Sequence, residues 1–456
     1  MNNKVSIPQG TRDFSAAVVY KRNFIFSTIR KVFELYGFEP LETPAFENLE
    51  TLLGKYGEEG DRLIFKILNN GLGNEKNIEK TRTAFEKVLA GKTSTDITER
   101  ALKYDLTIPF ARYVAMNHTK LNFPFKRYQV QPVWRADRPQ KGRYREFYQC
   151  DADVVGSNSL LNELELANIY HEVFHLLKIN KFEIRVNHRK ILTALAGLCG
   201  GEDRMGDIAI AIDKLEKTGP EKVKEELIQR GLNVEQVNTI ENYLNIAGSN
   251  EEKLFQVRTL LAGSETGSTG IDELEFLFSH TKNINLILDL TLARGLNYYT
   301  GTIFEARAPA EINMGSIGGG GRYDDLTGLF GVPGIPGVGI SFGVDRIYDV
   351  MEEMGLFPAN SGTGTKLLFF NMGEKESLFS FEIMQHLRNS GIACELFHEQ
   401  QKLDKQFKYA ENKQIPFVAI IGSKEMEDGN CQVKELSTGK QEMLACEKLP
   451  DYFNNL

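Results

Sequence analysis

A basic loop and a polar strand face adjoin each other in residues 125–153. Residues 120–146 carry eight Lys or Arg against two acids, a balance that suits phosphate groups. Beyond the loop, alternation places Gln149, Asp151 and Asp153 on one face of a strand, where they suit a small polar ligand. A solvated hairpin would explain a charged loop alone. The loop and the face together favour a site that binds an anion beside a small polar molecule.

Two strands and one loop must position these side chains. Arg127–Trp134 alternates and is rich in aromatic and β-branched residues, which predicts a strand. Residues 135–143 contain Pro139, Gly142 and many charges, which is typical of a loop. Arg145–Val155 alternates again. The pattern therefore predicts an antiparallel hairpin.

Asp105 and Thr107 form a second polar pair. We expect Lys103–Thr107 to be a strand whose alternation turns both side chains the same way, with a helix at 110–116 after it. The alternative is that both residues cap this helix. Because the pair faces inward immediately before a helix, we favour a ligand-binding role.

Two glycine-containing segments near residue 330 also suit a ligand. Ile317–Leu326 contains four consecutive glycines, which either form a flexible linker or let the backbone approach a ligand closely. Val338–Met351 predicts a strand and then a helix, with Arg346 in the first helical turn. A cation there opposes the helix dipole, so we expect an anionic ligand to compensate it.

The string H-E-x-x-H occurs once, at His171, Glu172 and His175, within the predicted helix Leu160–Ile179. This spacing puts two imidazoles on one helix face, as in zinc hydrolases. No third ligand is marked downstream, and the five cysteines form no C-x-x-C pair. We therefore predict no metal site.

The composition is that of an ordinary water-soluble globular protein. The 456 residues are 41% hydrophobic and 25% charged, with a formal net charge of -8. No stretch reaches about 18 uninterrupted apolar residues, and Met1–Gly10 has no apolar core of a signal peptide. We expect a cytoplasmic protein with no membrane contact. The net charge does not exclude nucleic acid, because local basic patches set the field near phosphates.

The pattern of elements predicts an α/β (α+β) fold in several parts. Helical patterns dominate His188–His280, and Gly355–Thr365 has the composition of a linker. Strands and helices then alternate, which predicts a small α/β domain with a mostly parallel sheet that ends in a hairpin around Glu427–Gly429 and Ser437–Lys440. In chain order we expect a first domain in two parts (1–187 and 281–354), a surface insertion at about 66–100, a helical insertion (188–280), a linker (355–365) and a C-terminal domain (366–456).

Several strings resemble the class II aminoacyl-tRNA synthetases, in the form carried by histidyl-tRNA synthetases. R-P-Q-K-G-R-Y-R followed by F-Y-Q-C-D resembles motif 2 of that family. R-G-L-N-Y-Y, which starts at Arg294, is similar to a string of the histidyl branch, where Asp is usual in place of Asn297. The helix Lys21–Tyr36 and the expected strand Glu39–Phe46 resemble motif 1, and the segment around Arg346 resembles motif 3.

The resemblance implies an antiparallel-sheet catalytic domain, a helical insertion and a C-terminal anticodon-binding domain. It implies that ATP and L-histidine form histidyl-adenylate, and that histidine then passes to the 3′ end of tRNA(His). Mg²⁺ would enter with ATP, without a dedicated protein site. Motif 1 implies a homodimer.

The resemblance also implies roles for individual residues. Catalysis would rest on Arg294 and Arg135. Histidine would contact Asp105, Thr107, Gln149, Asp153, Tyr298 and Tyr299. ATP would contact Arg135, Asp137, Arg143, Phe147 and Arg346. The tRNA would contact Arg138, Gln140 and Lys141.

The main alternative is a paralogue without catalysis, either a histidine-sensing regulatory subunit or a synthetase-like tRNA-binding module. Such proteins resemble this fold but tend to lose the R-G-L-x-Y-Y string or the C-terminal domain. Both are present here, which favours the enzyme. Threonyl-type synthetases share the C-terminal domain but need zinc ligands that this sequence does not mark.

Overall fold

The computed structural model describes residues 5–281, 283–293, 298–358 and 364–456. The chain forms two compact units. The first contains the residues up to Arg12 together with Ile25–Leu356, and the second contains Asp13–Phe24 with Phe357–Leu456. Each unit has its own sheet and its own core, so each is described separately.

An eight-stranded sheet forms the centre of the first unit. In spatial order its strands are β1 (Glu39–Pro40), β5 (Phe125–Trp134), β6 (Glu146–Val155), β11 (Gly337–Gly343), β10 (Ser316–Tyr323), β9 (Thr302–Arg307), β7 (Glu183–His188) and β8 (Leu286–Leu288). Only the outer pairs β1–β5 and β7–β8 are parallel among these strands. The predicted hairpin of β5 and β6 is confirmed, and so is the antiparallel sheet that the resemblance implies.

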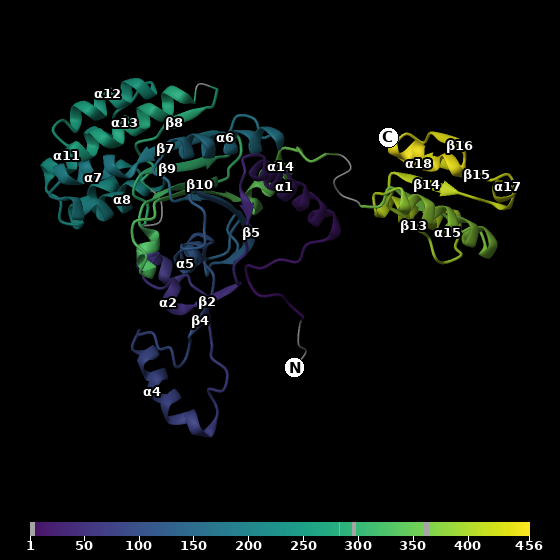
Figure 1. Cartoon of the computed structure of the whole chain (residues 1–456), viewed down its shortest axis with the longest axis horizontal. Coiled ribbons are helices and arrows are strands. Elements are labelled where there is room, and N and C mark those ends of the chain that lie inside the picture. Colours follow the sequence, from purple (N-terminus) through teal and green to yellow (C-terminus); the bar gives the residue numbers. More distant parts are fainter. Residues whose placement is uncertain (1–4, 282, 294–297, 359–363) are drawn as a thin grey trace. The chain divides into compact units, whose positions relative to one another are not determined.

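Aromatic side chains join two helices to this sheet. They are α1 (Ala16–Leu35), of which the part from Ile25 belongs to this unit, and α6 (Leu161–Leu176), while α14 (Val344–Glu353) directly follows β11. Phe342 of β11 meets Phe33 of α1 at 5.9 Å between ring centroids, and it meets Tyr170 and Phe174 of α6 at 4.9 and 5.5 Å. Burial of these large rings stabilises the face of the sheet that carries α6. Figure 1 shows α6 running across that sheet.

Helices fill the stretch between β7 and β8, as its patterns predict. They are α7 (Arg189–Leu198), α8 (Met205–Asp213), α9 (Leu215–Thr218), α10 (Pro220–Gln229), α11 (Val234–Leu244), α12 (Asn250–Leu260) and α13 (Glu265–His280). Capping boxes at Asn233 and Ser249 start α11 and α12. The first unit includes this stretch, and its standing as a separate domain stays a prediction.

A three-stranded sheet carries the predicted surface insertion. Its order is β2 (Phe46–Asn48), β4 (Arg100–Leu102) and β3 (Lys66–Ile67). The short helices α2 (Leu49–Leu52) and α3 (Gly57–Arg62) lie between β2 and β3 in the chain, and α4 (Ile78–Leu89) lies between β3 and β4. Figure 1 shows α4 beyond this sheet.

Two expected strands are wrong. Glu39–Phe46 is not one strand, because β1 and β2 belong to different sheets and Pro44, which has no backbone N–H, lies between them. Lys103–Thr107 is not a strand either, because β4 ends at Leu102 and α5 (Thr107–Asn117) begins at Thr107. The Asp105 carboxylate accepts the Ile108 N–H at 3.2 Å, a local bond that favours a helix start over a ladder.

The second unit contains a five-stranded sheet in the order β13 (Cys394–Leu396), β12 (Leu367–Phe369), β14 (Phe417–Ile420), β15 (Asn430–Glu435) and β16 (Gln441–Ala445). Its helices are α15 (Glu374–Asn389), α16 (Leu403–Asn412), α17 (Ser423–Glu427) and α18 (Leu449–Asn454). β12 pairs in parallel with β13 and β14, as the alternation of strands and helices predicts. The predicted closing hairpin is confirmed as β15 and β16, and its antiparallel pairs make up the other half of the strand pairs in this sheet, so the sheet is mixed and not mostly parallel.

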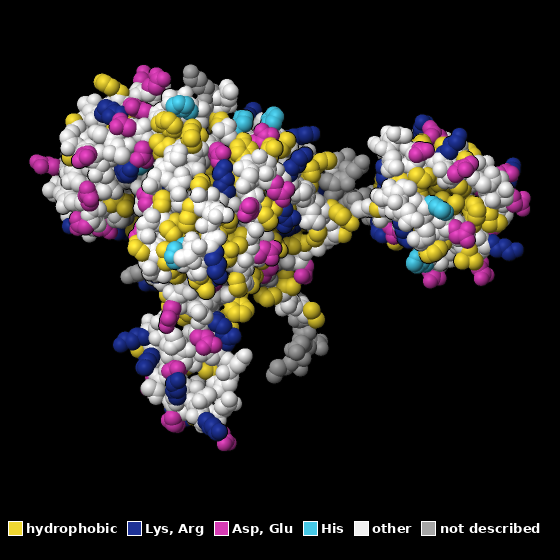
Figure 2. All heavy atoms as spheres, in the orientation of Figure 1, with side chains coloured by type: hydrophobic (Ala, Val, Ile, Leu, Met, Phe, Trp, Pro, Cys, Tyr) yellow, Lys and Arg dark blue, Asp and Glu magenta, His cyan; other side chains and the backbone are white. Residues whose placement is uncertain are grey.

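Acidic and basic side chains are interspersed over the visible face of the molecule (Figure 2). Within the described ranges, no helix combines the length and the apolar character that a membrane crossing requires.

Candidate active site

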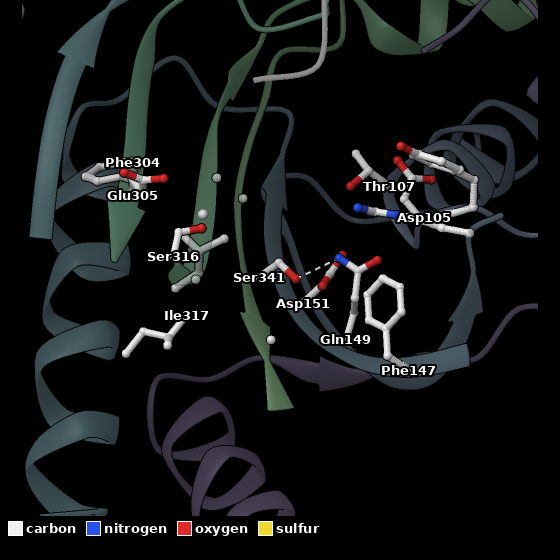
Figure 3. Close-up of a pocket in the computed structure, with 18 of the residues that line it drawn as sticks. Asp105, Thr107, Phe147, Gln149, Asp151, Phe304, Glu305, Ser316, Ile317 and Ser341 are labelled. Atoms are coloured by element: carbon white, nitrogen blue, oxygen red, sulfur yellow. Dashed lines mark hydrogen bonds between the residues drawn. The ribbon is translucent and has the colours of Figure 1, made fainter. Parts of the chain in front are cut away.

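A cavity of about 530 Å³ lies on the eight-stranded sheet, where β6, β9, β10 and β11 meet the segment before α5 (Figure 3). Residues from distant parts of the sequence converge there. The lining includes these predicted site residues: Asp105, Thr107, Arg135, Asp137, Arg143, Phe147, Gln149, Asp153, Tyr298, Tyr299 and Arg346. The structure thus brings the residues together, and their individual roles stay predictions.

The polar face of β6 points into the site because of its register with β11. Gln149 pairs with Gly343, Asp151 with Ser341, and Asp153 with Gly339. A Cβ at Gly339 would overlap the Asp153 carboxylate. Glycine at this position therefore leaves room for the buried acid between the strands.

Asp153 is held by a cation and a phenol. Arg127 of β5 lies 2.9 Å from its carboxylate, and the Tyr323 hydroxyl donates to it at 2.5 Å. Arg127 is fully buried, and its Nε and Nη1 atoms lack a hydrogen-bond partner among the described residues. Burial raises the pKa of Asp153, although the Arg127 charge acts in the opposite direction. The pair therefore forms a rigid, low-dielectric wall of the cavity.

Asp105 also lines the cavity and is buried. Its carboxylate accepts hydrogen bonds from the Tyr56 hydroxyl at 2.9 Å, the Ile108 N–H at 3.2 Å and the Tyr298 hydroxyl at 3.5 Å. Burial raises its pKa. The residue is thus both the helix cap and part of the cavity lining, which are the two alternatives that the sequence leaves open.

Gln149, Ser341 and Asp151 form a third polar group, and Figure 3 shows them next to one another. Gln149 Nε2 donates to the Ser341 hydroxyl at 2.8 Å, and Ser341 hydrogen-bonds the Asp151 carboxyl. Gln149 Oε1 is buried without a partner in the described part of the chain. Such an atom can accept a hydrogen bond from a bound ligand.

Tyr298 and Tyr299 close the cavity beside Asp105. Their ring centroids are 5.0 Å apart, and burial raises both pKa values, so both phenols stay protonated donors. A Cβ at Gly321 would lie 2.9 Å from the Tyr299 ring. The glycine run of β10 therefore makes room for this protein side chain.

Two arginines and two aromatic rings also line the cavity. The Arg135 guanidinium stacks 4.3 Å from the Tyr104 ring centroid and 5.2 Å from that of Phe147, and its Nε donates to the Tyr104 carbonyl at 3.1 Å. Arg346 donates to the carbonyls of Gly142 at 2.7 Å and Ser316 at 2.6 Å. These contacts fix the planes of two guanidiniums that suit phosphate oxygens.

The remaining predicted residues lie elsewhere. Arg138, Gln140 and Lys141 are not in the lining, and Lys141 forms an exposed ion pair with Glu353 at 2.9 Å. Arg294 and Asn297 lie outside the described residues.

Sequence reasoning missed several lining residues: Tyr56, Tyr104, Glu305 and Ser341. Asp151, which the strand alternation places on the same face as Gln149 and Asp153, does line the cavity with them. Tyr56 directly precedes α3 and carried no local signal.

The H-E-x-x-H string lies on α6, with the His171 and His175 rings stacked at a centroid distance of 6.3 Å. Across the ranges that the structure describes, no group of three or more His, Cys, Asp or Glu is placed to hold a metal ion.

The antiparallel sheet, with arginines and a polar strand face on one cavity, is the architecture that the resemblance to class II aminoacyl-tRNA synthetases implies. Comparison with known proteins then narrows the class. The family model for histidyl-tRNA synthetase matches residues 93–347, and an anticodon binding domain model matches residues 369–456. The chain belongs to the histidyl-tRNA synthetase family.

Individual members of this family are similar to the chain over nearly its whole length. The chain is 51% identical to "Histidine--tRNA ligase" of Christiangramia forsetii, over 97% of this chain and 98% of the relative. It is 33% identical to the crystal structure of histidyl-tRNA synthetase from Nostoc sp. PCC 7120, with a TM-score of 0.82 and 99% of each chain covered. An ATP phosphoribosyltransferase regulatory subunit/histidyl-tRNA synthetase from Bacillus halodurans has a TM-score of 0.67 at 20% identity, over 89% of this chain and 96% of that one. This last likeness shows the fold alone.

Proposed function

We infer that this chain is a ligase that activates L-histidine with ATP and transfers it to the 3′ end of tRNA(His). The observation that carries this conclusion is the 51% identity to a histidine–tRNA ligase over nearly the full length of both chains. The same relationship decides against a regulatory histidine sensor, which the fold alone would permit.

Histidine would bind among the acidic and phenolic side chains that line the cavity. Its ammonium would contact Asp105, Thr107 and Gln149. Two observations support this placement: the Asp105 carboxylate is buried, and the Gln149 amide oxygen has no hydrogen-bond partner among the described residues. Its imidazole would meet the group that contains Asp153, Tyr298 and Tyr299. Pairing both ring nitrogens gives specificity, because an analogue without them would leave buried polar groups unpaired.

ATP would occupy the end of the cavity that carries the arginines. Arg135 and Arg143 would hold the α-phosphate region, and Arg346 would hold the γ-phosphate. Phe147 would stack on adenine, and Asp137, which lies 3.5 Å from Arg143, would orient that guanidinium. The donor set fits a polyphosphate, because fixed guanidiniums give bidentate hydrogen bonds to its oxygens. Mg²⁺ bound by the nucleotide would offset the remaining phosphate charge.

The first step joins the two substrates without a nucleophilic side chain. The histidine carboxylate attacks the α-phosphorus in line, the bond to the β-phosphate oxygen breaks, and pyrophosphate leaves. Arg294 would stabilise the charge that grows on the α-phosphate, beside Arg135. Positioning and electrostatics therefore supply the catalysis.

In the second step a hydroxyl of the terminal adenosine of tRNA attacks the histidyl carbonyl, and AMP leaves. Arg138, Gln140 and Lys141, at the tip of the loop between β5 and β6, would contact the tRNA. The match to an anticodon binding domain in residues 369–456 supports a second tRNA contact. The likeness of the N-terminal segment to motif 1 supports a homodimer, and we place the enzyme in the cytoplasm.

Pyrophosphate exchange tests the assignment. The purified chain, with ATP and Mg²⁺, is assayed with each of the twenty amino acids in turn. We expect exchange with histidine and only background exchange with the others. Equal exchange with another amino acid, or none with histidine, would overturn the proposed function.

A further inference from the structure

Three strands place one buried carboxyl group between two polar partners. Gln129 of β5 pairs with Asp151 of β6, and Asp151 pairs with Ser341 of β11. Gln129 is fully buried and Asp151 is 2% exposed. Asp151 lines the cavity, but its Oδ1 and the Gln129 Oε1 are themselves buried, so each of these atoms needs a hydrogen-bond partner.

Two oxygen atoms in this row lack a partner. Asp151 Oδ1 and Gln129 Oε1 are both buried without a hydrogen bond among the described residues. Side chains directly opposite on antiparallel strands have Cβ atoms about 4.5–5.5 Å apart. An ionised Asp151 would thus put two acceptors side by side with no donor between them.

Lys103 fixes which atom of Gln129 is the unpartnered one. Its ammonium, which can only donate, gives a hydrogen bond to Gln131 Oε1 at 2.6 Å. Gln131 therefore presents its oxygen to this network, and Gln129 donates to that oxygen through Nε2 at 2.5 Å. Gln129 Nε2 also donates to the Thr43 hydroxyl at 2.9 Å. Both amide hydrogens of Gln129 are used, so the atom left over is an acceptor.

The groups around Asp151 disfavour an ionised carboxyl. Burial raises its pKa to about 7, against the lowering effect of Arg127. Arg127 is already paired with Asp153 at 2.9 Å. The titratable and charged groups that act on Asp151 from the surrounding elements are Lys103, Asp105, Arg127, Asp153, Tyr170 and Tyr299.

We propose that Asp151 is a positioning residue that works as a neutral acid: its O–H donates to Gln129 Oε1, and its other oxygen accepts from Ser341. Ser341 accepts from Gln149 Nε2 at 2.8 Å. A chain of hydrogen bonds then runs from Lys103 through Gln131, Gln129, Asp151 and Ser341. It ends at Gln149, whose free Oε1 receives the ammonium of histidine.

This role rests on the proposed function and adds a pH dependence to it. Loss of the proton leaves a buried carboxylate facing Gln129 Oε1, and the row that orients Gln149 is broken. Histidine binds the protonated form, so its KM rises as pH increases through about 7. Well above the pKa of Asp151, the histidine KM rises about tenfold per pH unit.

The test compares three variants in histidine-dependent pyrophosphate exchange between pH 6 and 9. Asp151→Asn supplies an amide donor and a carbonyl acceptor without a titrating proton, so we expect a histidine KM within about twofold of wild type at pH 6 and no alkaline rise. Asp151→Ala should raise KM about tenfold at every pH. Asp153→Asn, which breaks the ion pair with Arg127, is the matched control for the loss of an ionised carboxylate. It should raise the histidine KM more than Asp151→Asn does.

Infrared spectroscopy separates this proposal from the proposed function. The wild-type protein should show a protonated-carboxyl band at pH 6 that fades towards pH 9 and is absent in Asp151→Asn. No such band, or an Asp151→Asn variant as damaged as Asp153→Asn while its thermal unfolding is unchanged, would overturn the neutral-acid role. Failure of exchange in the wild-type protein, with the band present, would overturn the proposed function alone.

Discussion

At the scale of single residues, one side chain serves both fold and site. Asp105 accepts the Ile108 N–H at the start of α5 and also lines the cavity with Tyr56 and Tyr298 as partners. Asn is as good a helix cap as Asp, because its side-chain oxygen accepts the same bond. Replacing Asp105 by Asn therefore separates the two roles.

Asp105→Asn and Gln149→Ala should each raise the histidine KM by roughly 10- to 100-fold, because each removes a desolvated partner of a charged group. The exchange assay gives KM, and thermal unfolding gives the control. Asp105→Asn should leave the melting temperature almost unchanged, since the cap survives. An unchanged KM in both variants would contradict the placement of the histidine ammonium.

A substitution at Arg294 tests how much of the reaction rate depends on stabilising the charge at the α-phosphate. Removal of one such donor costs roughly a hundred- to a thousandfold in rate. We expect Arg294→Ala to bind histidine normally by calorimetry and to exchange pyrophosphate that much more slowly. Arg258→Ala, which removes an exposed partner of Asp272 on the helical insertion, is the matched control. Full exchange in Arg294→Ala would defeat this role while leaving the family assignment intact.

At the scale of elements, the sequence predicts those strands and helices whose residues follow a regular alternation or a helical periodicity. The β5–β6 hairpin and the helices between β7 and β8 follow from such patterns. The segment that holds Asp105 does not, because a side-chain cap and not a ladder sets its backbone. Likewise Tyr56 reaches the site only through tertiary packing, which no local pattern shows. Alternation thus predicts the polar face of β6, whereas Glu305 of β9 and Ser341 of β11 reach the cavity through strand pairing across the sheet, which no local pattern shows.

Gln140 and Lys141, at the tip of the β5–β6 loop, do not line the cavity, whereas the neighbouring Gly142 and Arg143 do. Gln140→Ala and Lys141→Ala should leave pyrophosphate exchange within about twofold and lower aminoacylation of tRNA. The Lys141–Glu353 pair is exposed, and such pairs add little to stability, so folding should not change. Glu353→Gln is the control, because it removes the same ion pair without removing the cation. Equal losses in both assays would mean that the loop tip contacts ATP or histidine.

A buried corner joins β7 to the helical insertion. Burial alone would raise the pKa of Glu273 on α13, but hydrogen bonds from His188 at 2.8 Å and Lys190 at 2.5 Å outweigh it and lower that pKa to about 2. A lowered pKa stabilises the fold above the unfolded-state value, and this contribution is lost as pH falls towards 2.

Glu273→Gln should therefore lower the free energy of unfolding at pH 7, by about 1–2 kcal/mol once solvent screening of this half-buried group is allowed for. The difference from wild type should shrink as pH falls below about 4.5. Denaturant unfolding at several pH values measures it. A difference that is constant with pH would show that the lost contacts, and not the charge, account for the effect.

At the scale of the whole molecule, the chain contains two separately built cores. The first unit packs aromatic rings of α1 and α6 on Phe342, and the second encloses its own cluster around Phe369, Phe417 and Phe453. The candidate site lies entirely within the first unit. Proteins with more than one core commonly unfold in more than one step.

We therefore expect scanning calorimetry to show two transitions, of which histidine with a non-hydrolysable ATP analogue raises only one. A ligand at a hundred times its Kd stabilises its unit by about 2.7 kcal/mol, which corresponds to roughly 4 °C for a unit as large as the first one. Lysine in place of histidine, with the same analogue, is the control and should give a smaller shift. An equal rise of both transitions would show that the two units unfold together, and no rise with histidine would contradict binding in the cavity of the first unit.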